Sequence, residues 1–191
     1  MNQIYKITAI IVMAVFLVQC SPKTTAPVIE TPQVTEPPTP PVTDSPNPCK
    51  SFSDLSGSDR DKAETAFVLY KDQMKYNNYK AALPIWRQAY TMAPGSNGRV
   101  KSHFDDGVTI YSKLIQETND STQKRLYVDT IRMIQAKREA CFGADASYIG
   151  QKAFDYYYNL NGLVPEKEIY ETFKKSVDMG NGKMEYFIVN P

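Results

Sequence analysis

The sequence predicts an all-α protein built from antiparallel helix pairs, and three observations carry this prediction. From residue 59 onward, apolar side chains recur at steps of three and four, which is the period of an amphipathic helix. Short runs of Asn, Gly, Pro or Ser separate these segments, and such residues end helices and form turns. No segment alternates apolar and polar residues with the period of two that is typical of a half-buried strand.

The first three helices are predicted from clear stop signals. Asn77 and Asn78 end the first, and Pro94 ends the second. Pro84 lies near the first turn of the second helix, where its missing amide hydrogen costs little. The third helix, over residues 99–118, ends at Asn119. Their apolar stripes are Ala63, Ala66, Phe67, Tyr70 and Met74, then Ala82, Leu83, Trp86, Ala89 and Tyr90, then Val100, Phe104, Val108, Tyr111, Leu114 and Ile115.

The last three helices are predicted from their caps. Ser121 is expected to cap the fourth helix, which runs to about Phe142, and Asp145 to cap the fifth. Pro165 suits the first position of the sixth helix, where Glu166 favours the positive end of the helix dipole. Their apolar stripes are Leu126, Val128, Ile131 and Ile134, then Ile149, Ala153, Phe154 and Tyr157, then Ile169, Phe173 and Val177.

The N-terminus predicts export. Residues 7–18 form an almost unbroken apolar run after Lys6, too short for a membrane span of about 20 residues and suited to a secretory signal core. The following Leu-Val-Gln-Cys ends at Cys20 and resembles the lipobox of bacterial lipoproteins, departing from it at Gln19, where Gly, Ala or Ser is usual. The resemblance implies a signal peptide over residues 1–19 and acylation of Cys20. The alternative is an uncleaved N-terminal membrane helix.

A proline- and threonine-rich segment over residues 20–48 separates the anchor from the rest of the chain. It holds nine of the thirteen prolines and no aromatic residue, so it cannot bury enough apolar surface to offset its ordering entropy. We expect a disordered tether with a reach of about 90 Å at polyproline-like extension. The alternative is a proline-rich ligand for a partner's groove.

Residues 49–191 are long enough for one domain with its own core. With 22 basic and 21 acidic side chains, the chain has no charge excess that would indicate nucleic acid as a partner. Cys49 and Cys141 are the cysteines left after acylation of Cys20. They form either one disulfide or two free thiols, and neither is spaced for a metal site. No cofactor and no metal are expected.

The first helix pair resembles the tetratricopeptide repeat. In that family the second helix has, in order, a tyrosine, a small residue, a leucine, a bulky aromatic residue, a small residue and a proline that ends the helix. The same spacing is found here in Tyr79, Ala82, Leu83, Trp86, Ala89 and Pro94. Leu69 fits the first helix, while Tyr70 replaces a small residue and Gln73 a tyrosine. The other two pairs match only in outline. The resemblance covers residues 62–179 and implies a short right-handed solenoid that contacts other proteins and has no catalytic residues. The apolar tail over residues 183–191 either folds back as a cap or belongs to a longer array.

Two groups of side chains are candidate sites. His103 beside Asp105 and Asp106 suggests a metal or acid–base pair, but at an early helical turn we expect these residues to be solvated and to offset the helix dipole. Tyr156, Tyr157 and Tyr158 lie 100° apart around a helix, so at least one ring should be exposed. They are either a contact surface for a partner or a glycan, or amphipathic rings at the core edge.

These features together predict a lipid-anchored adaptor, not an enzyme, that binds another protein of a Gram-negative envelope. No aspartate follows Cys20, so we expect the outer membrane, facing the periplasm. The first alternative is a glycan-binding lipoprotein that uses the exposed tyrosines. The second is an envelope hydrolase, for which the sequence shows no nucleophile–base pair.

Overall fold

The computed structural model describes residues 47–98 and 101–182, and all regular structure in these two ranges is helical. A short 3₁₀-helix, η1, precedes six α-helices, and a π-helical segment, η2, follows the fifth of them. The elements are η1 (Phe52–Asp54), α2 (Gly57–Lys75), α3 (Tyr79–Met92), α4 (Ser102–Glu117), α5 (Ser121–Phe142), α6 (Ala146–Phe154), η2 (Asp155–Asn159) and α7 (Glu166–Met179). The predicted all-α class is thus confirmed for this part of the chain.

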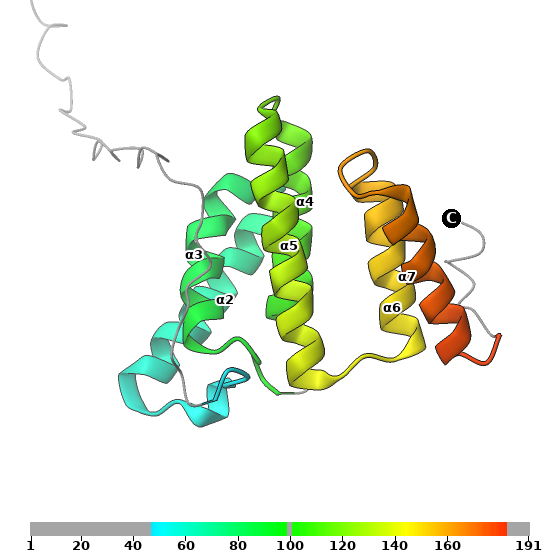
Figure 1. Cartoon of the computed structure of the whole chain (residues 1–191). Helices are drawn as coiled ribbons and strands as arrows, with labels where there is room; N and C mark the ends of the chain where they lie inside the picture. The colour runs from blue at the N-terminus through cyan, green and yellow to red at the C-terminus, as the bar shows by residue number, and fades with distance from the viewer. Residues whose placement is uncertain (1–46, 99–100, 183–191) are drawn as a thin grey trace, which may run out of the picture. The chain divides into compact units, whose positions relative to one another are not determined.

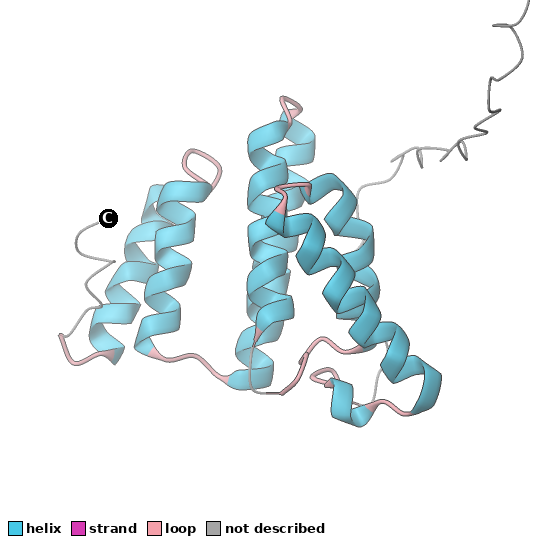
Figure 2. Cartoon of the chain, turned by 180° about the vertical axis from the view of Figure 1, so that it is seen from behind, coloured by secondary structure: helices cyan, strands magenta, loops and turns pink. Residues whose placement is uncertain are grey.

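The α-helices pack as consecutive pairs, α2 with α3, α4 with α5, and α6 with α7 (Figure 1). A short turn joins the two helices of each pair, so they run antiparallel, as the view from behind also shows (Figure 2). The first two pairs are held together by the packing of α3 against α4. The predicted pairing of consecutive helices is therefore present in the described residues.

Local sequence accounts for most helix ends. Asp145 caps α6 as predicted, since its carboxylate accepts a hydrogen bond from the Tyr148 amide at 2.8 Å. At the start of α5 the prediction was one residue late. The cap is Asp120, whose side chain accepts from the amides of Thr122 and Gln123, while Ser121 is the first helical residue. A carboxylate is the stronger acceptor there.

The core runs through all three pairs. Trp86, Tyr70, Tyr111 and Tyr156 are among the largest fully buried side chains, and aliphatic residues of α4, α5 and α7 surround them. The indole N–H of Trp86 donates to the backbone carbonyl of His103 at 2.8 Å, which ties α3 to the first turn of α4. Aromatic rings thus fill the spaces between helices that approach through Ala66, Ala82 and Ala89.

A disulfide between Cys49 and Cys141 joins the segment before η1 to the end of α5. The same segment is held by backbone bonds, from the Gly95 amide to the Lys50 carbonyl and from the Phe52 amide to the Ser96 carbonyl. Gly95 is required here, because a Cβ atom would overlap the carbonyl oxygen of Cys49. The start of the domain is thereby fixed to the α3–α4 connection and to α5.

The fifth predicted helix is interrupted. Its α-helical part ends at Phe154 and continues as the π-helical η2, which widens the backbone before the turn into α7. Single π turns of this kind often occur at functional sites.

The predicted signal peptide over residues 1–19, the acylated Cys20, all but the last two residues of the tether predicted over residues 20–48, and the tail over residues 183–191 lie outside the described residues.

Candidate functional site

His103 is buried in an aromatic cage, contrary to the expectation that it is solvated. The rings of Phe52, Phe67 and Tyr70 surround its imidazole at centroid distances of 5.4 to 5.8 Å. Nδ1 donates to the Ala93 carbonyl at 2.7 Å, and Nε2 is buried without a partner among the described residues. Burial lowers the pKa of His103 to about 4, so the ring is neutral. It packs as part of the core.

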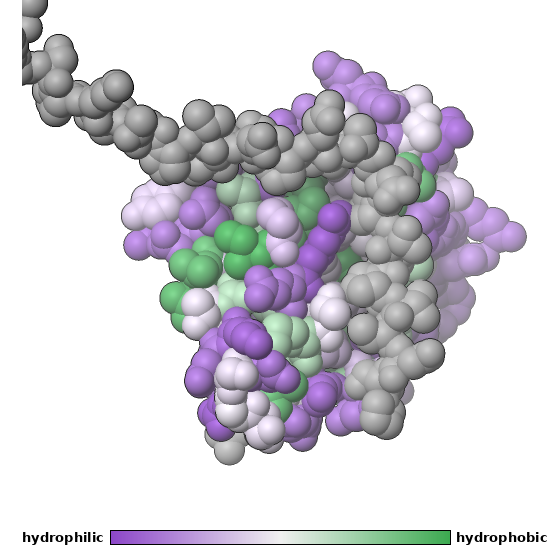
Figure 3. Space-filling view, turned by 90° about the vertical axis from the view of Figure 1, so that its left-hand side faces the viewer, coloured by the Kyte–Doolittle hydropathy of each residue, from purple (hydrophilic) through white to green (hydrophobic). Residues whose placement is uncertain are grey.

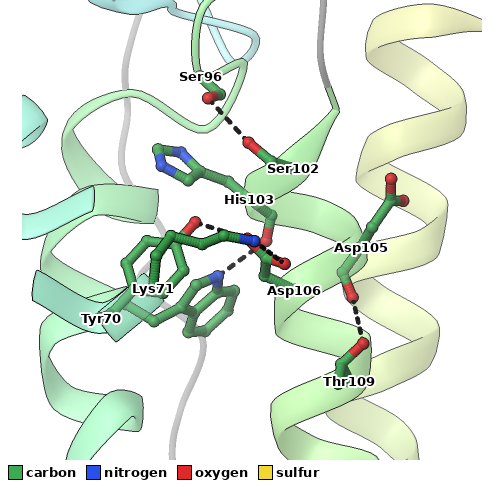
Figure 4. Close-up of polar contacts among 9 residues, drawn as sticks. Tyr70, Lys71, Ser96, Ser102, His103, Asp105, Asp106 and Thr109 are labelled. Atoms are coloured by element: carbon green, nitrogen blue, oxygen red, sulfur yellow. Dashed lines mark hydrogen bonds and ion pairs between the residues drawn. The ribbon is translucent and has the colours of Figure 1, made fainter. Parts of the chain in front are cut away.

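Asp106 is also buried, and its carboxylate links α4 to α2 (Figure 4). It accepts a hydrogen bond from the Tyr70 hydroxyl at 2.9 Å and two from the Lys71 ammonium at 2.9 and 3.0 Å. The expectation of a solvated acid is therefore wrong for Asp106.

Asp105 alone fits the expectation of solvation, because most of its side chain is exposed. It points away from Asp106 and forms an ion pair with Arg138 of α5 at 3.5 Å. The polar groups of the three residues thus bind different partners: the His103 ring the Ala93 carbonyl, Asp106 the Tyr70 hydroxyl and Lys71, and Asp105 Arg138.

A cavity beside α4 has a volume of about 360 Å³ and is walled by α4, α5, α6 and η2. We call it the Arg138 cavity. Its residues are Phe104, Asp105, Val108, Thr109, Ser112, Lys113, Ile134, Gln135, Arg138, Tyr148, Gln151, Asp155 and Asn159. The volume lies within the range usual for small-ligand sites, and most of the lining residues carry polar groups, although more of the lining surface is apolar than polar.

Arg138 places a buried positive charge at this cavity, which Lys113 also lines. Its guanidinium lies 3.3 Å from the ring centroid of Tyr148, a cation–π contact, and only 7% of the residue is exposed. Apart from the long ion pair to Asp105, Nε and Nη1 have no hydrogen-bond partner among the described residues. The Ser112 hydroxyl is likewise buried and unpartnered.

Carboxylates balance this positive charge. Burial raises the pKa of Asp155 to about 6, against the opposing effect of hydrogen bonds donated by Gln151 and Asn159. The pKa of Asp105 is raised as well, because surrounding protein atoms partly desolvate its carboxylate even though much of the side chain is exposed, and the Arg138 charge opposes this. The cavity therefore holds both strong donors and strong acceptors.

The sequence contained a signal for this cavity that the motif search missed. Arg138 follows Ile131 and Ile134 at helical spacing, so a charge occupies a position of the apolar stripe of α5. On α4, Ser112 likewise follows Val108 and precedes Ile115 at helical spacing, so a hydroxyl occupies a position of the apolar stripe. Polar side chains seldom occupy buried positions of a helix, and those that do are usually paired with a ligand, a water molecule or an opposite charge.

The repeat positions of α3 are placed as a packing motif requires. Ala82, Leu83, Trp86, Ala89 and Pro94 are buried, and Tyr79 is half-buried against the core.

Leu69 does not pack as expected, because half of its surface (51%) is exposed. It lines an open depression that Gln88 of α3 also borders.

Two of the three consecutive tyrosines are exposed. Tyr157 and Tyr158 are 49% and 44% accessible, whereas Tyr156 is buried and donates a hydrogen bond to Gln135 at 2.9 Å. Tyr156 must therefore be removed from the predicted contact surface. The rings of Tyr157 and Tyr158 meet edge to face at 81°, so they do not form one flat platform.

A second exposed apolar region lies on α2. Val68, Leu69 and Tyr76 are 63%, 51% and 69% accessible, and we call these three residues the α2 face. An open depression of about 440 Å³ adjoins it, lined by Leu69, Thr65 and Lys62 of α2 and by Gln88 of α3, among others. Figure 3 shows apolar side chains gathered among polar ones on the side of the molecule where α2 and α3 lie.

Within residues 47–98 and 101–182, no three acidic, histidine or cysteine side chains are grouped so that they could hold a metal ion. In the same ranges, no helix has the length and apolar character needed to cross a membrane. No protein-family model matches the chain, and neither a curated protein nor a solved structure matches it significantly.

Proposed function

We propose that this chain is a lipid-anchored adaptor of a bacterial envelope that docks another envelope protein on its α2 face. The anchor and tether of the proposal come from the sequence: a lipobox-like segment ending at Cys20 and a proline-rich stretch after it. Most lipoproteins without an aspartate after the acylated cysteine would face the periplasm from the outer membrane, and we place this one there.

The helix pairs support the adaptor as a short tetratricopeptide-like solenoid. Small residues at Ala82 and Ala89 let α2 and α3 approach, and Trp86 fills the space between α3 and α4. Stacked pairs of this kind offer extended surfaces to partners, since each pair contacts only its neighbours.

The α2 face is the single observation that carries the proposal. In a stack, the outer side of a helix is either polar or covered by the next helix. Here Val68 and Leu69 are adjacent on α2, Tyr76 follows directly after the end of the helix, and more than half of each residue is exposed. Burying an aliphatic side chain of this size stabilises a contact by about 1.5 to 3 kcal/mol. A helix packed along α2 would continue the stack and remove these side chains from water.

The tether adds to this affinity. A chain held near a membrane meets a neighbouring membrane protein at an effective concentration set by the tether length, which favours a modest docking surface.

Site-directed photo-crosslinking tests the proposal. A benzophenone amino acid replaces Tyr76 in the full chain, expressed in its own envelope, and replaces Tyr170 of α7 as a control of similar exposure (67%). We expect one discrete crosslinked product from position 76 and none of the same size from position 170. The Leu69→Asp substitution should abolish the product from position 76. Equal products from both positions, or a product unchanged by Leu69→Asp, would contradict docking at the α2 face.

A glycan-binding role is the second candidate, supported by the exposed rings of Tyr157 and Tyr158. Tyrosine rings stack on sugars as well as on protein surfaces. Calorimetric titration of the full chain with soluble cell-wall glycan and plant glycan fragments tests it. Saturable binding that is lost in Tyr157→Ala and kept in Tyr170→Ala would favour this role over the adaptor.

A further inference from the structure

Unpartnered donors are concentrated at the Arg138 cavity. Among the described residues, four buried side-chain polar atoms have no hydrogen-bond partner, and three of them belong to two residues that line this cavity. They are the Ser112 hydroxyl and two nitrogens of Arg138, of which Nε has only the 3.5 Å ion pair to Asp105 and Nη1 has none. Both residues are more than nine-tenths buried, at 3% and 7% exposed. Buried polar atoms are nearly always paired, so two such side chains beside one cavity indicate a missing partner.

The donors can reach the cavity with small movements. The Ser112 hydroxyl turns by rotation about one single bond, and the Arg138 guanidinium can tilt over the ring of Tyr148 without leaving it. Gln135 does not compete for them, since its side-chain oxygen accepts the hydrogen bond from Tyr156.

The donors and acceptors of the cavity define the chemistry of a ligand. A guanidinium presents parallel N–H groups that match the two oxygens of a carboxylate. Asp105 and Asp155 line the same cavity and accept hydrogen bonds, so a bare anion would be repelled, whereas a molecule that also carries donors would be held at both ends. About 360 Å³ is enough for a molecule of amino-acid or monosaccharide size and too little for a folded segment.

We propose that the Arg138 cavity binds a small carboxylate whose carbon skeleton also bears ammonium or hydroxyl donors, as an amino acid or a sugar acid does. The carboxylate pairs with Arg138 and accepts from Ser112. The donors of the ligand face Asp155 and Asp105. The π-helical turn of η2 brings Asp155 and Asn159 to the wall of the cavity, opposite the α4 residues.

The site is separate from the α2 face, so the two proposals fail independently. Partner docking depends on Leu69, and ligand binding depends on α4, α5 and η2.

Calorimetric titration of the detergent-solubilised full chain tests the site with four probes. D-Glucuronate carries a carboxylate and hydroxyls, and L-alanine carries a carboxylate and an ammonium group. Acetate has only the carboxylate, and glucose has only the hydroxyls. We expect saturable binding of glucuronate or alanine, at least tenfold tighter than that of acetate and of glucose. The probe that binds identifies the source of the donors, a sugar acid or an amino acid.

Variants locate the binding. Arg138→Met should weaken it at least tenfold, while Arg125→Met, an exposed arginine on the same helix, should leave it unchanged. Ser112→Ala should weaken it severalfold, and it removes only one oxygen, so it serves as the second variant if Arg138→Met fails to fold by circular dichroism. Absence of saturable binding for both glucuronate and alanine would overturn the proposal. So would acetate binding as tightly as either, or binding insensitive to both substitutions.

Discussion

The Tyr70 hydroxyl on α2 donates a hydrogen bond of 2.9 Å to the carboxylate of Asp106 on α4, across 36 residues of sequence. Lys71 reaches the same carboxylate from the next position on α2. One buried acid thus fixes the first helix of the first pair to the first helix of the second. The contact holds the α2 face in a defined position relative to the Arg138 cavity.

Removing the Tyr70 hydroxyl should destabilise the domain. Tyr70→Phe leaves Asp106 with Lys71 alone, and loss of a buried hydrogen bond to a charged group should lower the free energy of unfolding by about 1 to 2 kcal/mol. Urea denaturation of the full chain measures this. Tyr76→Phe, at an exposed tyrosine of the same helix, should change the value by less than about 0.5 kcal/mol. Equal effects of the two substitutions would refute the role of the hydroxyl.

The disulfide should contribute strongly to stability. Cys49 and Cys141 are 92 residues apart, and closing a loop of that length restricts the unfolded chain. A double substitution to serine should lower the free energy of unfolding by about 3 to 5 kcal/mol. Reductant should lower the thermal midpoint of the wild type towards that of the variant and leave the variant itself unchanged. A variant as stable as the oxidised wild type would show that the bridge constrains nothing.

His103 should make the stability depend on pH. Its pKa falls from 6.5 to about 4 on burial, so the unfolded state binds the proton more readily than the folded state. The stabilisation from the neutral His103 ring is fully present above pH 6.5 and is lost as the pH falls from 6.5 to about 4, with a total of about 3 kcal/mol. Asp155, whose pKa is raised, has the opposite slope between its unfolded value of 3.8 and about 6.

The two groups are separated by comparing variants. His103→Gln keeps a donor for the Ala93 carbonyl but does not titrate. In the wild type the opposite slopes of His103 and Asp155 largely cancel between pH 4 and 6. In this variant Asp155 is left uncompensated, so its unfolding free energy should fall as the pH rises from 4 to 6, more steeply than that of the wild type. If the unfolding free energies of the variant and of the wild type change with pH in parallel, the pKa of His103 is not lowered in the folded protein.

Gly107 should tolerate no larger side chain. A Cβ atom at this position of α4 would overlap the ring of Trp86. Gly107→Ala should therefore destabilise the domain by about 1 to 3 kcal/mol, although alanine favours a helix over glycine by about 1 kcal/mol. Trp86 is the only tryptophan, so its fluorescence reports the displaced ring directly. A stabilised variant with an unchanged spectrum would show that α3 and α4 are packed more loosely.

Local patterns predicted the helices because the information lies in neighbouring residues. The bounds of α3 follow from its apolar stripe and Pro94, and the start of α6 follows from Asp145. The predictions that failed depend on tertiary contacts. His103 looks like a solvated residue of a first helical turn, and only the approach of Phe52 and Phe67 buries it.

The candidate site was harder to predict for the same reason. Leu69 fits a packing motif, but whether such a position is covered depends on a neighbouring element that the motif does not specify. The Arg138 cavity joins residues of four elements, and the π turn that brings Asp155 there has no local signature. A charge within the apolar stripe of α5 was the one usable sign.

Quantitative affinity purification of the acylated full chain from envelope extracts tests the adaptor proposal most directly. Wild type, Leu69→Asp and Tyr170→Asp are compared at equal expression, with bound proteins measured by mass spectrometry. The proposal predicts one partner recovered in near-stoichiometric amount by wild type and Tyr170→Asp, and reduced at least tenfold by Leu69→Asp. Recovery of the same proteins in the same amounts by all three would contradict it.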